Sequence, residues 1–305
     1  MHAITRAAAA LLAATAFAGI TAGPVAAQDE APWTVANDVG GDYSYPVNAG
    51  DRVDDTLAVT NHGAAPLNLA VYAADAFTTA TGGLDLLTRD KPSTGVGAWV
   101  HPGTGHVTVP PGQTANVPFS VVVPADAPAG DHVGGILTAL TEGGAERRLG
   151  IRVRLRVGGD LRPGLTVDAP DVTYAGTFTP FGTGDATLTY TIRNTGNAVV
   201  AARQSASVSG PFGSWRTAAD PVPDTPRLLP GETWKVSVPV HGVTPAVHLT
   251  GTVTLVPLLT DAAGSTAPLP AADTSVGSWA IPWTLLALVV VLLGAAVFAI
   301  RRRRT

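Results

Sequence analysis

The side chains best suited to ligand binding are three arginines on one short segment. Arg152, Arg154 and Arg156 alternate with the apolar residues at 151, 153, 155 and 157. Because successive side chains of a β-strand point to opposite faces, the apolar set is expected to pack inward and the guanidinium groups to line the outer face. Guanidinium groups bind carboxylates and phosphates through paired hydrogen bonds. The segment therefore suggests an anion-binding stripe, and pairing with acidic residues of a neighbouring strand is the simpler alternative.

Aromatic residues of the N-terminal half offer a second kind of candidate site. Sugars stack on exposed aromatic rings, so a sugar-binding surface would present several of them on one face. The candidates are Trp33, Tyr43, Tyr45 and Trp99, of which Trp99 is expected to lie in the core. Tyr43 and Tyr45 therefore join the arginine stripe as candidate ligand-binding residues.

The sequence contains no recognisable catalytic or metal-binding motif. It has no Gly-x-Ser-x-Gly elbow and no His-Glu-x-x-His spacing. His101 and His106 flank a short loop that could bring them to a metal, but the spacing indicates no third ligand. Scattered carboxylates could pair as in a glycosidase, although nothing indicates the cleft that such a pair needs. They are Asp54, Asp55, Asp75, Asp85 and Asp90. We expect a non-enzymatic protein with no cofactor and no metal.

The N-terminus has the layout of a secretory signal. Arg6 supplies a positive charge, residues 7–20 are almost wholly apolar, and small residues precede position 28. This pattern predicts a signal peptide over residues 1–27, with cleavage between Ala27 and Gln28. An uncleaved anchor helix is the alternative, but Pro24 and its neighbouring glycines interrupt the apolar run early.

The C-terminus predicts a transmembrane helix over residues 279–300. Residues 281–300 are apolar, and at roughly 1.5 Å per residue they match a hydrocarbon core of about 30 Å. Trp279 and Trp283 occupy positions typical of a membrane interface. The cytoplasmic tail, residues 301–305, would stop transfer through Arg301, Arg302, Arg303 and Arg304. The expected location is the cell membrane, single-pass, with an extracellular N-terminal ectodomain. A buried core helix is the alternative, but it would give four consecutive arginines no role.

Charge and cysteine content narrow the possible partners of the ectodomain. Five of the 19 basic residues lie at the two ends, which leaves 14 against 23 acidic residues and a net charge near −9. Such a surface argues against a nucleic-acid partner. The chain has no cysteine, so no disulfide can stabilise it. The ectodomain must therefore depend on its hydrophobic cores.

The ectodomain is predicted to be all-β and built from an internal repeat. Short segments alternate with period 2, as in residues 188–192, and turn residues separate them. In each half, a strand ending in Asn-x-Gly is followed by a Pro-Gly turn and another strand. These segments are residues 57–63, 109–113 and 121–123, and again 190–196, 229–232 and 236–238. We expect two tandem immunoglobulin-like β-sandwich domains, at 28–158 and 159–260, and a flexible stalk at 261–278.

The first domain resembles the peptidoglycan-binding domain of WxL-interacting proteins, a Gram-positive surface family. The resemblance covers residues 33–157 and depends on several short motifs in order. They are Tyr45, Gly50, residues 59–61, 76–78 and 82–84, Trp99, residues 107–112 and 117–121, Pro124, Gly130 and residues 134–136. It implies an immunoglobulin-like fold that contacts peptidoglycan, then a second sandwich able to engage other proteins, and a membrane helix.

Together these observations predict a non-enzymatic cell-surface protein that binds peptidoglycan or another wall component. An accessory subunit that binds another exported or membrane protein through its sandwiches is the alternative. A wall-modifying hydrolase is a third possibility, but the sequence offers it no catalytic motif.

Overall fold

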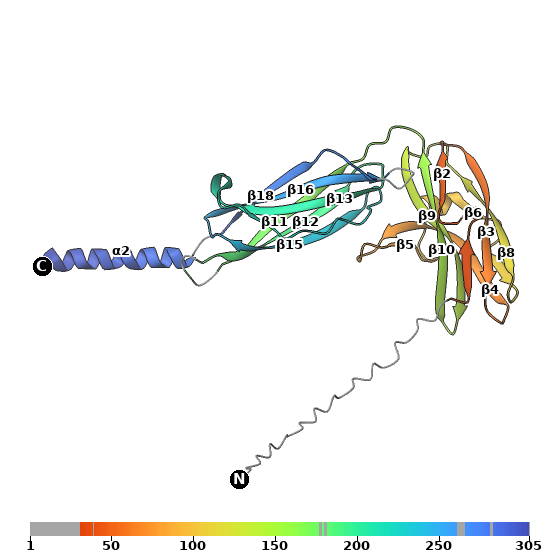
Figure 1. The fold of residues 1–305 in the computed structure, drawn as a ribbon, viewed down its shortest axis with the longest axis horizontal. Coiled ribbons are helices and arrows are strands. Elements are labelled where there is room, and N and C mark those ends of the chain that lie inside the picture. Colours follow the sequence, from red (N-terminus) through yellow and green to blue (C-terminus); the bar gives the residue numbers. More distant parts are fainter. Residues whose placement is uncertain are drawn as a thin grey trace, which may run out of the picture.

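The computed structural model describes residues 31–38, 40–176, 179, 182–260, 266–280 and 283–304. Two β-sandwiches follow one another along the chain, and helix α2 (Trp283–Arg304) extends from the end of the second one that is farther from the first (Figure 1). The predicted signal peptide, with Ala27 and Gln28, lies outside the described residues. The expectation of an all-β protein is confirmed, because strands make up nearly every element.

The first sandwich consists of two sheets with immunoglobulin-like strand order. One contains, in order, β1 (Trp33–Ala36), β3 (Arg52–Asn61), β8 (Thr114–Val122) and β6 (Val100–Pro102). The other contains β2 (Tyr43–Val47), β10 (Ala145–Val157), β9 (Gly130–Glu142), β4 (Leu67–Thr78) and β5 (Leu84–Leu86), with β7 (His106–Val109) also on β4. The first strand switches sheets, because β1 pairs with β3 whereas β2 pairs in parallel with β10. A short helix, α1 (Val96–Trp99), packs against β4 and β9.

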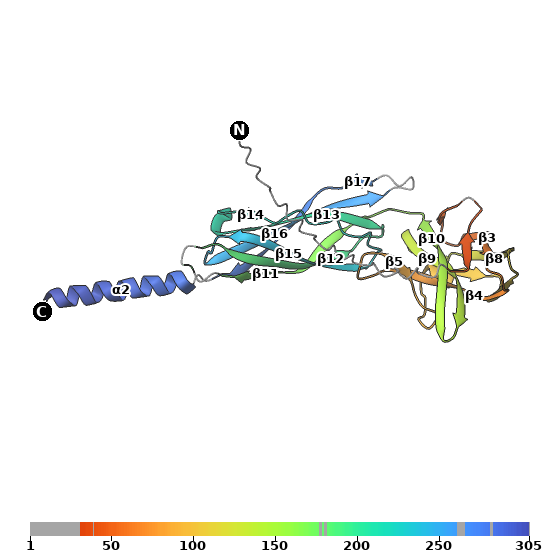
Figure 2. The same ribbon diagram turned by 60° about the horizontal axis from the view of Figure 1, so that its bottom comes forward.

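The second sandwich repeats this plan in a longer form. One sheet has the order β11 (Leu165–Ala175), β12 (Gly184–Asn194), β15 (Thr233–Val243). The other has β14 (Thr217–Ala218), β13 (Val200–Ser209) and β16 (His248–Thr260), and β16 pairs with both β17 (Thr266–Pro268) and β18 (Ala272–Trp279). A short 3₁₀ turn, η1 (Pro211–Gly213), follows β13. Figure 2 shows the same arrangement from another direction.

Each sandwich has its own hydrophobic core, made from the inward residues of its alternating strands. In the first, Leu57, Leu69 and Ile136 are fully buried between the sheets. In the second, Leu188 and Leu255 occupy comparable positions. The two cores are separate clusters, and residues 158–164 of the chain connect the two sandwiches. Burial of these side chains contributes about 1.5–3 kcal/mol each, which is how a chain without disulfides holds two sandwiches together.

The sequence repeat corresponds to one buried asparagine used twice. The side-chain amide of Asn61 donates to the carbonyls of Ala65 and Val109 at 2.8 and 2.9 Å, and its Oδ1 accepts from Gly63. Asn194 makes the matching bonds to Ala198 and Leu228, also at 2.8 and 2.9 Å, and accepts from Gly196. Both side chains are almost completely buried. The Asn-x-Gly motif therefore closes a turn in each sandwich and joins it to a distant segment, β7 in the first and the segment around Leu228 in the second.

The structure differs from the expected stalk over residues 261–278. Residues 266–268 and 272–279 form β17 and β18, which pair with β16 and extend the second sandwich to Trp279. The side chain of Thr254 donates to Asp273 at 2.6 Å across this pairing. The segment is poor in apolar residues because an edge strand is held mainly by its backbone hydrogen bonds.

The prediction of a transmembrane helix at the C-terminus is wrong. In the part of the chain that the structure describes, no helix is long and apolar enough to cross a membrane. Over residues 286–303, α2 includes Arg301, Arg302 and Arg303, so the apolar stretch ends at position 300. Trp279, expected at a membrane interface, ends β18 and packs edge-on against His248, while Trp283 and Arg304 are the end residues of α2. The single-pass location in the cell membrane is therefore contradicted.

We expect Asn61→Ala to lower the free energy of unfolding by about 1–3 kcal/mol, because it removes the donor to the buried carbonyl of Val109 and to the part-buried carbonyl of Ala65. Asn116→Ala is the matched control, since Asn116 is exposed on β8 of the same sandwich. Denaturant unfolding of both variants measures the difference. Equal stability of the two variants would contradict the role given to Asn61.

Tyr190 makes the stability of the second sandwich sensitive to alkaline pH. Its hydroxyl donates to Gln204 at 2.7 Å, and burial raises the pKa of Tyr190 to about 12. The unfolded chain ionises near pH 10 while the folded chain does not, so this contribution to stability is present below pH 10 and is lost as pH rises toward 12. We expect a loss of about 2–3 kcal/mol over that interval. The free energy of unfolding, measured at several pH values between 10 and 12, should fall less steeply in Tyr190→Phe than in the wild type. Equal slopes in the two proteins would contradict this role of Tyr190.

Candidate functional site

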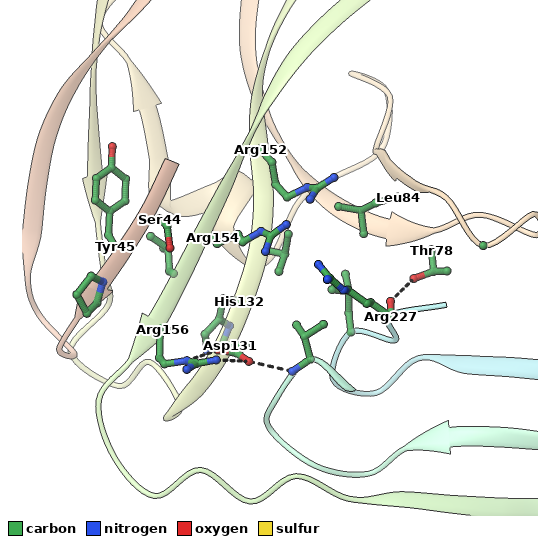
Figure 3. A pocket seen from close by; sticks show the side chains of 16 residues that line it. Ser44, Tyr45, Thr78, Leu84, Asp131, His132, Arg152, Arg154, Arg156 and Arg227 are labelled. Atoms are coloured by element: carbon green, nitrogen blue, oxygen red, sulfur yellow. Dashed lines mark hydrogen bonds and ion pairs between the residues drawn. The ribbon is translucent and has the colours of Figure 1, made fainter. Parts of the chain in front are cut away.

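A cavity lies between the two sandwiches. It has a volume of about 390 Å³, and residues of both domains line it. The first sandwich contributes the outer faces of β10, β9 and β2 and the hairpin that ends in β5, while the second contributes loop residues Val199, Arg227 and Leu229. We call this cavity the interdomain cleft. Its side chains are shown in Figure 3.

The arginine stripe of β10 faces this cleft, as strand alternation predicts. Arg152 and Arg154 both donate to Oδ2 of Asp42, each at 3.1 Å. Arg156 instead binds both oxygens of Asp131, through Nε at 2.6 Å and through Nη2 at 3.1 Å. The expected pairing with acidic residues is present, and the same arginines line a cavity, whereas anion binding by the stripe stays a prediction.

A fourth guanidinium group comes from the second sandwich. Arg227 projects from that domain toward Arg154, and both lie with Arg152 around one space (Figure 3). Among the residues that the structure describes, Arg227 has no carboxylate partner. Burial lowers the pKa of Arg152, the negative charge of Asp42 raises it, and the positive charges of Arg154 and Arg227 lower it. A bound anion would relieve this repulsion.

The charge balance of the interdomain cleft is positive on an otherwise acidic chain. Four guanidinium groups line it, and the paired carboxylates are those of Asp42 and Asp131. Glu232 lies at one margin, where the hydroxyl of Thr78 and the amide of Leu229 already bind it at 2.6 and 2.9 Å. Charged walls of one sign around a partly enclosed space concentrate ligands of opposite sign.

Hydrogen bonds on two sides of the cleft join the sandwiches. On one side, the amide and hydroxyl of Thr78, at the end of β4, donate to the carboxylate of Glu232 at 2.8 and 2.6 Å. On the other, the amide of Val199 donates to Asp131 at 2.9 Å, and the amide of Asp131 donates to the carbonyl of Asn197 at 2.8 Å. The cleft is therefore bounded by two sets of contacts that fix the domains relative to each other.

Asn197 also holds the connecting segment in place. Its side-chain amide donates to the carbonyls of Ala129 and Asp160, and its Oδ1 accepts from the amide of Arg162 at 2.6 Å. Gly130, with a φ of +131°, allows the close approach of Asn197, because a Cβ at residue 130 would collide with the Asn197 carbonyl. The residue at 130 thus has to be small for the domains to meet.

A smaller cavity of about 310 Å³ adjoins the cleft along β10. Arg152 and Leu84 line both cavities, and Asp42, Arg148 and Leu137 line only the smaller one. The two cavities therefore meet at Arg152, beside the carboxylate that this arginine binds.

The predicted aromatic platform is not present in the first sandwich. Trp33, Tyr43 and Trp99 are buried in the core. Tyr43 donates to the carbonyl of Thr56 at 2.6 Å, and burial, with a smaller effect of Asp55, raises its pKa. Tyr45 reaches the cleft, but its hydroxyl points away from the arginines and donates to Asp55, and burial followed by this bond raises its pKa (Figure 3).

The other candidate groups do not come together. His101 lies on β6 and His106 on β7, which belong to opposite sheets. Asp75 accepts from the amides of Thr94, Gly95 and Gly97, so it fixes a loop. In the described residues there is no cluster of three or more side chains that could hold a metal ion. The remaining candidate carboxylates, Asp54, Asp55, Asp85 and Asp90, have separate local partners.

Sequence reasoning missed three residues of the cleft. Asp42 follows two glycines in a turn, Asp131 begins a strand, and Arg227 lies in a long connection. Charged residues of these types are frequent in turns, at strand ends and in loops, so no local sequence pattern distinguishes these three as residues of a binding site. Only their approach to β10 in the fold gives them a shared place.

Comparison with known proteins gives a likeness in overall shape alone. No protein-family model matches the chain, and no curated protein matches it. Similar solved structures include the YadV chaperone, at 11% identity and a TM-score of 0.36 over 80% of this chain and 100% of that chain. They also include the Pseudomonas aeruginosa CupB2 chaperone, at 12% identity and a TM-score of 0.32 over 79% and 98%. A family 123 glycoside hydrolase from Clostridium perfringens matches at 12% and 0.29, over 38% and 22%. Function therefore has to be argued from this chain's own geometry.

Gly130→Ala should loosen the junction, because the added methyl group collides with Asn197. We expect amide hydrogen exchange at Asp131 and Val199 to rise by about tenfold or more. Gly112→Ala is the control, since Gly112 also has a positive φ, of +68°, but has open space around its Cβ. Equal exchange at the junction in the two variants would contradict this account.

Proposed function

We propose that this chain is a non-enzymatic binding protein that holds an acidic segment of another exported protein in the interdomain cleft. The observation that supports the proposal is the convergence of Arg152 and Arg154 of one sandwich with Arg227 of the other on a single cavity. Paired guanidinium groups recognise carboxylates through charge-assisted hydrogen bonds. Because the arginines come from two domains, the site depends on the fixed junction between them.

The lining of the cleft favours a protein segment over a purely charged polymer. Leu84, Val133 and Val199, which are half-buried, and the exposed Pro46 lie among the arginines. A polypeptide segment can place apolar side chains against such residues and acidic side chains against the guanidinium groups. A charged polymer without apolar groups would leave this part of the wall uncovered.

Peptidoglycan binding stays a prediction, as does the resemblance to WxL-interacting proteins. The aromatic side chains that would favour a sugar-stacking surface in the first sandwich are mostly buried. The carboxylates of a wall polymer remain a possible source of the anion, and the experiment below separates this source from a protein segment.

Two of the cleft arginines should be needed for binding. The probe is an acetylated and amidated peptide of alternating glutamate and valine, titrated into the full-length chain by calorimetry. We expect the double variant Arg154→Gln with Arg227→Gln to bind at least about tenfold more weakly, because two charge-assisted hydrogen-bonding groups are lost. We also expect wild-type affinity to fall as salt is raised.

The matched control is a double variant that removes two positive charges elsewhere. Arg52 and Arg193 form ion pairs with Asp54 and Asp168, outside the cleft. Arg52→Gln with Arg193→Gln should leave peptide binding nearly unchanged. If the wild type does not bind the peptide but sediments with insoluble peptidoglycan, and does so only when the cleft arginines are present, the ligand is a wall polymer and not a protein segment. Absence of both would overturn the proposal.

A further inference from the structure

Of the two carboxylates that bind the arginine stripe, that of Asp42 is held less firmly. It closes the turn between β1 and β2, directly after Gly40 and Gly41, which have φ values of +76° and +87°. A Cβ on either glycine would meet no atom within 4 Å, so these two glycines have open space beside them. The side chain of Asp42 is 38% exposed, whereas that of Asp131 is 10% exposed.

Asp42 is also held by weaker hydrogen bonding than Asp131. Asp131 binds Arg156 with both oxygens and also accepts from the amide of Val199. Asp42 holds Arg152 and Arg154 through one oxygen, Oδ2, at 3.1 Å each. Two guanidinium groups that converge on one oxygen have unused donors, since each carries five N–H bonds. Paired N–H···O contacts with a carboxylate are the stronger arrangement for such groups.

We propose that Asp42, bound to Arg152 and Arg154 at the edge of the interdomain cleft, occupies the position of a ligand carboxylate and is replaced there when the ligand binds. This inference rests on the proposed function and adds its regulation. The ligand carboxylate binds Arg152 and Arg154, with Arg227 of the second sandwich approaching from the other side. The side chain of Asp42 turns into solvent, and no covalent bond changes.

Competition by Asp42 has two consequences for the site. In the free protein, the carboxylate neutralises part of the charge of the stripe, so weak anions are excluded. In the complex, its departure frees Arg152 at the point where the two cavities meet. An extended ligand segment can then continue from the cleft into the smaller cavity, where Arg148 and Asp85 both line the wall. The site therefore selects a ligand that makes contacts beyond a single carboxylate.

The experiment is a calorimetric titration of the same glutamate–valine peptide into four forms of the full-length chain. They are the wild type, Asp42→Asn, Asp54→Asn, and Asp42→Asn combined with Arg154→Gln. We expect Asp42→Asn to bind about tenfold more tightly than the wild type, because the competing charge is gone. Asp54→Asn removes the same charge from an exposed ion pair of β3 outside the cleft and should bind within about twofold of the wild type. The combined variant should lose the gain.

The outcomes separate this inference from the proposed function. If the wild type binds the peptide and Asp42→Asn binds no more tightly, the competition is overturned and the binding site stands. If neither form binds, both are overturned. A gain shared by Asp54→Asn would mean a general effect of charge and would also overturn the competition. Thermal unfolding of each form checks its fold, and Asp42→Ala provides a second variant with the same expected gain.

Discussion

The carboxylate of Asp131 is the contact on which the arrangement of this protein depends. It binds Arg156 of the first sandwich with both oxygens and accepts the amide of Val199 from the second. A partly buried carboxylate with several donors is costly to move, because each lost bond would leave a charge without compensation. Together with the contact between Thr78 and Glu232, it turns two separately cored sandwiches into a cleft of defined shape.

The arginine stripe of β10 holds the two sandwiches together at one end, and at the other end its arginines keep donors that a ligand can use. Arg156 is committed to the junction through Asp131, whereas Arg152 and Arg154 share a single oxygen of a more exposed carboxylate. Arg227 adds a charge from the second domain. Burial and the like charges of Arg154 and Arg227 lower the pKa of Arg152 while Asp42 raises it, so a further negative charge at this place would favour the charged guanidinium group. This difference along β10, from the tightly paired Arg156 to the loosely paired Arg152 and Arg154, is the physical basis of the proposed function.

Sequence patterns predicted the elements whose side chains alternate strongly. The β10 stripe, the strands of both cores and the repeated Asn-x-Gly turn all follow from local periodicity and turn chemistry. The patterns failed where backbone pairing matters more than side chains. β17 and β18 contain mostly small and polar residues, so their place beside β16 could not be inferred from composition. Aromatic residues were ambiguous for the opposite reason, since a ring suits a core as well as a binding surface.

The sequence by itself determined that the chain is all-β, that its two halves share a plan, and that three arginines occupy one face of a strand. These properties depend on neighbours in the chain, and alternation makes them visible. Only the tertiary structure decided what those arginines face. Asp42, Asp131 and Arg227 come from a turn, a strand start and a loop as much as 185 residues apart, and packing of the two sandwiches brings them to β10. Contacts between distant residues depend on the whole fold, so no local pattern encodes them.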